Sequence, residues 1–110
     1  MHAQKIDNIH FYTTWSLDKY SENGEYYFPP KKERGDYISL NPDMTFTSKA
    51  EGKDSSGTWI FNANGKYIEL KSASGDIEKL YIHFLSDKSM IVTYDVDKYR
   101  LWHVHYVSKA

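Results

Sequence analysis

Cysteine is absent from this chain of 110 residues. Its absence excludes disulfide bonds, thiol catalysis and thiolate metal sites, but it leaves the compartment open because exported proteins can also lack cysteine. The sequence also lacks any run approaching the about 18 apolar residues that a membrane span requires. We therefore expect no membrane-spanning helix.

A strong charge of one sign is missing as well. The formal net charge is −1, and acidic and basic residues are interspersed. Such a chain has no field that could hold a polyanion by counterion release, so nucleic acid is not an expected partner. The short basic cluster Lys31-Lys32-Glu33-Arg34 is typical of a solvated loop surface.

Aromatic residues are abundant, with ten tyrosines and three tryptophans. Together with valine, isoleucine and threonine they favour strands over helices. A chain of this length forms one domain with a small core. The composition predicts a single all-β domain.

The clearest local signal lies in Ser56–Leu70, where Asn64-Gly65 predicts a two-residue type I′ turn between two alternating segments. Closing the chain at this turn places the large apolar side chains on one face and polar ones on the other. The predicted pairs are Phe61 with Ile68, Trp59 with Leu70, Ile60 with Glu69 and Thr58 with Lys71.

Alternating segments separated by turn residues recur along the chain, and Asn41-Pro42-Asp43 predicts a second tight connection that pairs Leu40 with Met44. Eight strands joined by short connections indicate an antiparallel meander, and closure into an up-and-down barrel would remove its edges. Besides the two strands around Asn64-Gly65, the predicted strands are 11–20, 36–40, 44–49, 77–85, 90–94 and 99–107. For 90–94 alternation does not decide which side chains point inward, because that strand is apolar on both faces.

The connections differ in length between the two ends of this barrel. Tight turns at 41–43, 64–65 and 86–88 fall at one end, and the long 21–35 loop falls at the other, where it would form the lid of an open mouth. The N-terminal segment 1–10 lacks a clear period and is predicted to be either a barrel plug or disordered. The barrel domain spans 11–110.

The segments Thr14-Trp15-Ser16-Leu17, Gly57-Thr58-Trp59 and Tyr67-Ile68-Glu69-Leu70, with the stretch 38–46, carry a family resemblance. In their order and spacing they resemble the lipocalin-like domains of the calycin superfamily, in particular the compact forms in small exported bacterial proteins. The resemblance implies a non-enzymatic barrel whose calyx holds a small hydrophobic molecule. Ala3-Gln4 is similar to the junction left after signal-peptide cleavage, so we expect export to the periplasm, the cell surface or the medium.

Two interpretations of the barrel interior remain open, because a barrel of eight strands can be filled by side chains or hold one small ligand. Alternation points large aromatic side chains inward: Trp15, Trp59, Trp102, Phe46, Phe61 and Phe84. In the first interpretation an open cavity is lined by Trp15, Phe46, Phe61 and Trp102. In the second the core is solid, and the domain is a protein-interaction or inhibitor-type module.

The 21–35 loop carries Tyr26, Tyr27 and Phe28 beside Pro29-Pro30. Aromatic side chains at a barrel mouth can contact a ligand or a protein partner, and they can equally anchor the loop to the rim. We therefore include all three among the candidate ligand-binding residues and as the candidate protein-contact surface.

His103 and His105 lie two apart on the last predicted strand, so both project from one face about 6 to 7 Å apart, a spacing that can chelate a transition metal. An acid such as Asp95 or Asp97 would complete the site. The alternative is that both histidines are exposed on the outer surface. We find no catalytic residues, expect neither enzymatic activity nor a cofactor, and expect a monomer.

Overall fold

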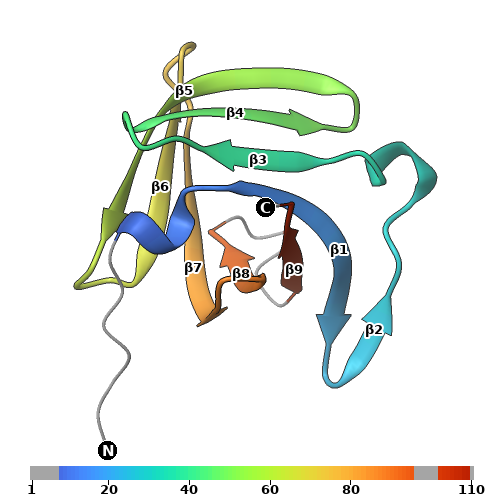
Figure 1. Ribbon diagram of the computed structural model, residues 1–110. Coiled ribbons are helices and arrows are strands. Elements are labelled where there is room, and N and C mark those ends of the chain that lie inside the picture. The colour runs from blue at the N-terminus through green and yellow to red at the C-terminus, as the bar shows by residue number, and fades with distance from the viewer. Residues whose placement is uncertain (1–7, 96–101, 110) are drawn as a thin grey trace, which may run out of the picture.

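The computed structural model describes residues 8–95 and 102–109, and these form an all-β protein (Figure 1). The predicted signal-peptide junction at Ala3-Gln4 and the start of the last predicted strand lie outside the described residues. The strands are β1 (Thr14–Glu22), β2 (Glu25–Tyr27), β3 (Tyr37–Leu40), β4 (Thr45–Ala50), β5 (Lys53–Asn62), β6 (Tyr67–Ser72), β7 (Ile77–Leu85), β8 (Ser89–Tyr94) and β9 (His103–Ser108).

The strands form one antiparallel sheet in the order β2-β1-β3-β4-β5-β6-β7-β8-β9, and β1 also pairs with β9. This last pairing closes β1 and β3–β9 into a barrel of eight strands, and β2 adds a short extension to β1. The predicted eight-stranded antiparallel meander barrel is confirmed. Closure satisfies the backbone groups that an open sheet would expose at its edges.

One end of the barrel is covered by the 3₁₀ helix η1 (Asn8–Phe11). The Phe11 side chain is completely buried, and its ring centroid lies 6.0 Å from that of Trp59 and 5.0 Å from that of Phe61. The indole Nε1 of Trp15 donates a hydrogen bond of 3.2 Å to the Phe11 carbonyl. The aromatic core is therefore packed against this end.

The hairpin of β5 and β6 has the predicted register, with Trp59 opposite Leu70 and Phe61 opposite Ile68. Its turn is different, because residues 63–66 form a longer connection in which Lys66 has the positive φ of 55°. The predicted type I′ turn at Asn64-Gly65 is wrong. Alternation on both strands determined the register independently of the turn.

Two-residue turns with positive φ at both positions occur elsewhere in the fold. Asn23-Gly24 has φ of 53° and 82° and joins β1 to β2, and Glu51-Gly52 has φ of 53° and 81° and joins β4 to β5. The 21–35 segment is thus more ordered than the predicted loop, since it contains the end of β1, all of β2 and the 3₁₀ helix η2 (Lys31–Glu33).

The predicted register of the β3–β4 hairpin is wrong by two residues, because Leu40 lies opposite Phe46 and not Met44. Met44 takes φ of 69°, and the Asn41 amide donates a hydrogen bond of 2.9 Å to the Thr45 carbonyl, so the turn is longer than predicted. A shift of two residues leaves each side chain on its original face. Ile38, Leu40 and Phe46 are therefore buried all the same, and Met44 is partly buried.

A register irregularity in β7 reverses the alternation that the sequence suggests. In β7 the irregularity between Ile82 and Phe84 leaves Phe84 51% exposed and buries Leu85. The prediction that Phe84 points inward is therefore wrong, because an extra residue changes which face the following side chains occupy.

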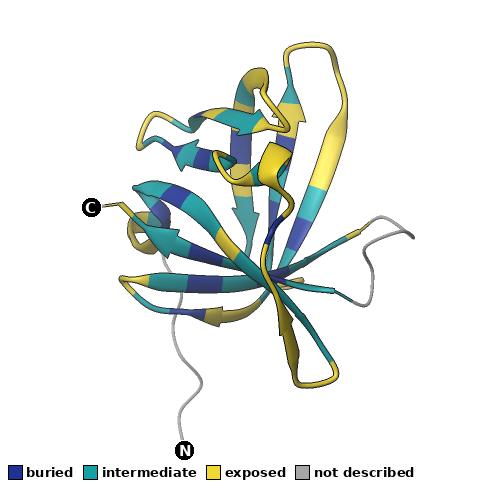
Figure 2. Ribbon diagram, turned by 90° about the vertical axis from the view of Figure 1, so that its right-hand side faces the viewer, coloured by how far each residue is buried: buried dark blue, intermediate teal, exposed yellow. Residues whose placement is uncertain are grey.

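In β8 the structure places Met90 and Val92 in the core. Figure 2 shows the buried positions as bands along the barrel strands, with exposed residues gathered at the hairpins.

Candidate functional site

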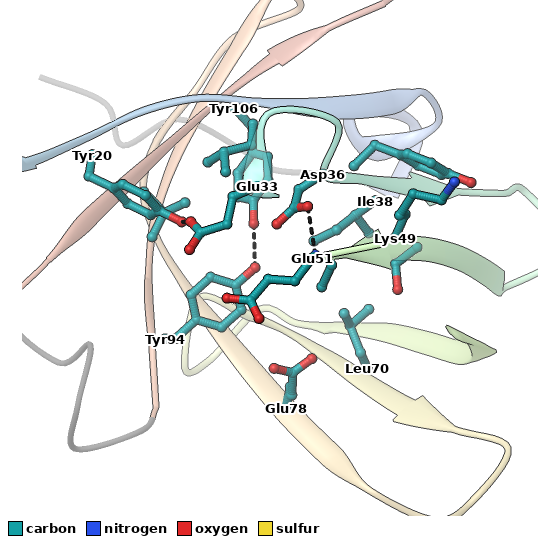
Figure 3. Close-up of a pocket in the computed structure, with 15 residues that line it drawn as sticks. Tyr20, Glu33, Asp36, Ile38, Lys49, Glu51, Leu70, Glu78, Tyr94 and Tyr106 are labelled. Carbon is teal, nitrogen blue, oxygen red and sulfur yellow. Dashed lines mark hydrogen bonds between the residues drawn. The ribbon is translucent and has the colours of Figure 1, made fainter. Parts of the chain in front are cut away.

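A cavity of ≈ 540 Å³ opens at the end of the barrel away from η1 (Figure 3). Glu33 and Asp36, from the connection between β1 and β3, line it, so it lies at the end where the sequence placed the open mouth. Its other lining residues are Leu17, Tyr20, Tyr37, Ile38, Ser48, Lys49, Ala50, Glu51, Leu70, Glu78, Tyr94, Val104 and Tyr106.

The inner wall of this cavity is apolar. Ile38, Leu70 and Val104 come from β3, β6 and β9, and each is buried and belongs to the core. They face one another because alternate residues of every barrel strand point inward. A ligand that reaches this wall would bury apolar surface.

Tyr94 and Tyr106 place two phenolic hydroxyl groups in this apolar setting. The two hydroxyls are hydrogen-bonded to each other, and Tyr106 is only 5% exposed. Burial raises the pKa of Tyr94 and of Tyr106, so both remain neutral phenols. One hydroxyl of the pair acts as donor and the other as acceptor, which leaves one O–H able to donate elsewhere.

Tyr20 reaches the cavity because of an irregularity in β1. The register of β1 with β9 shifts between Leu17 and Lys19, after which Tyr20 pairs with Val104 and lines the cavity. Its hydroxyl donates a hydrogen bond of 2.5 Å to Oε1 of Glu33. Burial, together with this carboxylate, raises the pKa of Tyr20.

Four carboxyl groups and one lysine line the cavity. Asp36 accepts a hydrogen bond of 2.8 Å from the Glu51 amide, and burial raises the pKa of Asp36 all the same. Burial, and secondarily the neighbouring Asp76, also raises the pKa of Glu78. The Glu78 side chain is in contact with water, yet the protein around the mouth makes its ionisation less favourable than in open solution.

The predicted ligand-binding residues lie outside the lining of this cavity. Trp15 and Phe46 are buried in the core, and Phe61 packs beside Phe11 near the covered end. Trp102 is partly exposed and packs against the rings of Tyr20 and Tyr27, at centroid distances of 5.7 and 5.2 Å. Contact of any of these residues with a ligand stays a prediction.

Sequence reasoning missed most of the polar lining. Alternation predicts that Tyr106 points inward but does not mark it as a site residue, and it does not decide which face of 90–94, and so of Tyr94, points inward. The inward turn of Tyr20 depends on the β1 irregularity, for which the sequence offers no signal. The carboxyl groups come from three separate parts of the chain, the connection before β3, the β4–β5 turn and β7, so no local motif could have grouped them.

The candidate protein-contact residues are exposed on β2 and just after it. Tyr26, Tyr27 and Phe28 are 64%, 41% and 86% exposed. Tyr26 is held by neighbours on the outer surface, with the amino group of Lys19 4.7 Å from its ring centroid and the ring of His105 5.8 Å away. Phe28 is the most exposed of the three.

His103 and His105 lie on the outer face of β9, opposite the side occupied by Val104 and Tyr106. The ring of His103 lies 4.8 Å from that of His83, and Nε2 of His105 hydrogen-bonds Oγ of Ser21 at 2.8 Å. Within residues 8–95 and 102–109, no group of three or more potential ligands is arranged to hold a metal ion. Asp97 lies outside that part of the chain, and metal binding stays a prediction.

A second hollow of ≈ 710 Å³ lies on the outer surface of β1 and β3. Although it is larger, its lining is mostly polar and includes Ser16, Asp18 and Arg34. The barrel cavity offers both buried apolar wall and convergent polar groups, which is the usual character of small-molecule sites. We therefore take the barrel cavity as the candidate site.

Comparisons with known proteins agree with this architecture. A family model described as a lipocalin-like domain matches residues 13–92. The crystal structure of a DUF4847 family protein from Bacteroides vulgatus superposes with a TM-score of 0.58 at 11% sequence identity, covering 90% of this chain and 94% of that one. At this identity the likeness concerns the fold. A search of curated proteins finds no match. Within the described residues no helix is long and apolar enough to span a membrane.

Proposed function

Because the chain belongs to the family of lipocalin-like domains, we propose that it is a non-enzymatic binding protein that holds one small, largely apolar molecule in its barrel cavity. The observation that carries this proposal is the ≈ 540 Å³ cavity at the open end of the barrel. Small-molecule sites commonly measure about 300 to 1,000 Å³ and combine an apolar wall with a few placed polar groups. Ile38, Leu70 and Val104 supply the wall.

A barrel interior filled with side chains would have favoured the alternative interpretation, a protein-interaction module with a solid core. Three aromatic rings gather near the covered end, where Phe11 contacts both Trp59 and Phe61. Small or short side chains such as Ser48 and Ala50 line the other end. The tyrosines of the lining leave a volume of ≈ 540 Å³ beside these short side chains, and this space supports a cavity that can take a ligand.

The test is binding of a neutral, environment-sensitive dye, N-phenyl-1-naphthylamine, followed by its fluorescence. Ser48→Trp would fill the cavity, because Ser48 lies two residues after the inward Phe46 on β4 and lines the cavity. The matched control is Thr47→Trp, which adds the same ring to an exposed neighbour on the outer face.

We expect the wild type and Thr47→Trp to bind the dye, and Ser48→Trp to bind it at least about tenfold more weakly, since the ring occupies the apolar space. Circular dichroism and a urea titration establish that both variants are folded. Absence of dye binding to the folded wild type, or equal binding by the two variants, would contradict the proposal.

A second role, as a protein-interaction module, is favoured by one observation, the exposure of Tyr26 and Phe28 on and beside the short strand β2. Exposed aromatic groups are enriched in protein interfaces. The variant Tyr26→Ser/Phe28→Ser should lose a purified partner that the wild type captures, while Ser48→Trp should retain it. If the first variant retains the partner, this surface is not the interface.

A further inference from the structure

We infer that the molecule held in the barrel cavity is an organic cation, with an ammonium group placed among the carboxylates at the mouth and an apolar body against the inner wall. This inference names the ligand class of the proposed binding function and therefore rests on it. It depends on three features of the cavity. Four carboxyl groups line it, nearby basic side chains neutralise them only in part, and the Tyr94–Tyr106 pair has one hydroxyl proton to donate.

The carboxyl groups of Glu33, Glu51 and Glu78 lie around the space beside the Tyr94–Tyr106 pair (Figure 3). Asp36 lies on the same side of the cavity as Glu33. Four acids against one lysine give the mouth a negative potential, and an enclosing wall of low polarity strengthens such a field. Anions are disfavoured in this setting and cations are attracted.

The neighbouring basic side chains compensate this charge poorly. Nζ of Lys49 lies 3.9 Å from Asp54, which is not a lining residue, and Nζ of Lys32 lies 3.3 Å from Glu51 in an exposed ion pair. Exposed pairs of this kind contribute little. Glu78 has no hydrogen-bond or ion-pair partner within the described part of the chain, so its carboxylate is available to a ligand.

A single metal ion fits these acids badly. Among the described residues no three acidic or histidine side chains are close enough together to hold one ion. The carboxylates are instead spread around the mouth on η2, the β4–β5 turn and β7. An ammonium group that donates to one or two of them, and carries an apolar body, suits this spacing better.

The tyrosine pair adds a hydrogen-bond donor to the cavity. Tyr94 and Tyr106 share one hydrogen bond, so one of their two hydroxyl protons has no acceptor within the described part of the protein. Each of the two hydroxyl oxygens has a partner in this bond, and the remaining proton lies at the wall of the cavity, because both tyrosines line it. A ligand oxygen beside the ammonium group would accept this proton.

The groups that face the ligand also predict how its affinity depends on pH. The acidic groups are Glu33, Asp36, Glu51 and Glu78. The basic groups nearby are Lys32 and Lys49. The pKa of Asp36 and that of Glu78 are raised, so both protonate at a higher pH than ordinary carboxyl groups do. Cation affinity should fall as the pH is lowered through this range.

The test compares three ligands that share a phenoxyethyl body with an ether oxygen: 2-phenoxyethylammonium, 2-phenoxyethanol and 3-phenoxypropanoate. Isothermal titration calorimetry on the full chain measures each affinity. We expect the ammonium compound to bind about tenfold or more tightly than the alcohol, because hydrogen bonds to charged groups are the strongest available. The carboxylate compound should bind most weakly.

Two variants locate the effect. Glu78→Gln should weaken ammonium binding about tenfold, since it removes a cavity carboxylate. Glu69→Gln is the matched control, because Glu69 pairs with the exposed Ile60 on the outer face of β6 and is absent from the lining. It should leave ammonium binding within about twofold of the wild type. Equal losses in the two variants would overturn the inference, since the cavity carboxylate would then not recognise the charge.

The remaining outcomes separate this inference from the proposed function. If the alcohol or the carboxylate compound binds as tightly as the ammonium compound, the cavity is a binding site but not for cations. The same conclusion holds if none of the three binds at about 10 mM while the neutral dye does. If neither the dye nor any of the three binds, both the inference and the proposed function are wrong.

Discussion

The hydroxyl of Tyr20 donates a hydrogen bond of 2.5 Å to the carboxylate of Glu33, which joins β1 to the short helix η2 at the mouth of the barrel. The helix η2 contains no buried residue, so packing contributes little to holding it in place. Tyr20 reaches this position because the register of β1 shifts just before it. The wall of the cavity and its rim are thus linked through one side chain.

Tyr20→Phe should loosen η2 with little effect on the barrel. Loss of this bond to a partly exposed carboxylate should reduce the free energy of unfolding by about 1 kcal/mol. Amide hydrogen exchange should accelerate at 31–36 and stay unchanged in β5 and β6. The control is Tyr27→Phe, whose hydroxyl bonds the exposed Glu25. Equal exchange at 31–36 in the two variants would show that the Tyr20–Glu33 bond does not hold η2.

Glu78→Gln should stabilise the protein at neutral pH. The folded state raises the pKa of Glu78, so the folded protein binds this proton more tightly than the unfolded chain does. Stability from this group is present below its unfolded pKa of about 4.3 and is lost as the pH rises through the folded pKa. Urea titrations should show the variant more stable than the wild type at pH 7, with the difference shrinking toward pH 4. A difference that grows toward pH 4 would mean that the carboxylate is stabilised by its surroundings. Glu69→Gln serves as the control outside the cavity.

Phe11→Ala should reduce the free energy of unfolding strongly and Phe84→Ala only slightly, although both substitutions remove the same ring. Phe11 is fully buried against Trp59 and Phe61, so its loss should cost about 3 to 5 kcal/mol. Phe84 is 51% exposed, and its loss should cost less than about 1.5 kcal/mol. Chemical denaturation of the two variants measures the contrast, and similar costs would place Phe84 in the core.

Gly57→Ala should disrupt the β5–β6 pairing. A Cβ atom at residue 57 would lie 2.0 Å from the Lys71 carbonyl oxygen, which belongs to the backbone of the adjacent strand and cannot rotate away. We expect a loss of about 3 kcal/mol or more, as for other backbone clashes in a packed sheet. Gly35→Ala is the control, because no atom lies within 4 Å of its Cβ position. If Gly57→Ala melts at the same temperature as Gly35→Ala, the backbones of β5 and β6 do not approach this closely at residue 57.

Alternation made much of the barrel predictable. Trp59 opposite Leu70 follows from a period of two on both strands, and this register survives a mistaken turn type at Asn64-Gly65. The β3–β4 register failed because the turn length was inferred from Asn41-Pro42-Asp43, whereas Met44 adopts a positive φ and extends the turn. Patterns that extend along whole strands were reliable, and those that depended on one turn were not.

The amino-acid sequence by itself determined the all-β class, the eight-stranded meander, the family resemblance and the end at which the barrel opens, because these depend on repeated alternation and on the lengths of connections. Tertiary structure alone decided which polar groups meet in the cavity. Tyr20 turns inward through a strand irregularity, and Glu33, Glu51 and Glu78 converge from elements distant in sequence. Barrel closure brings such residues together, and no local pattern encodes the contact between them.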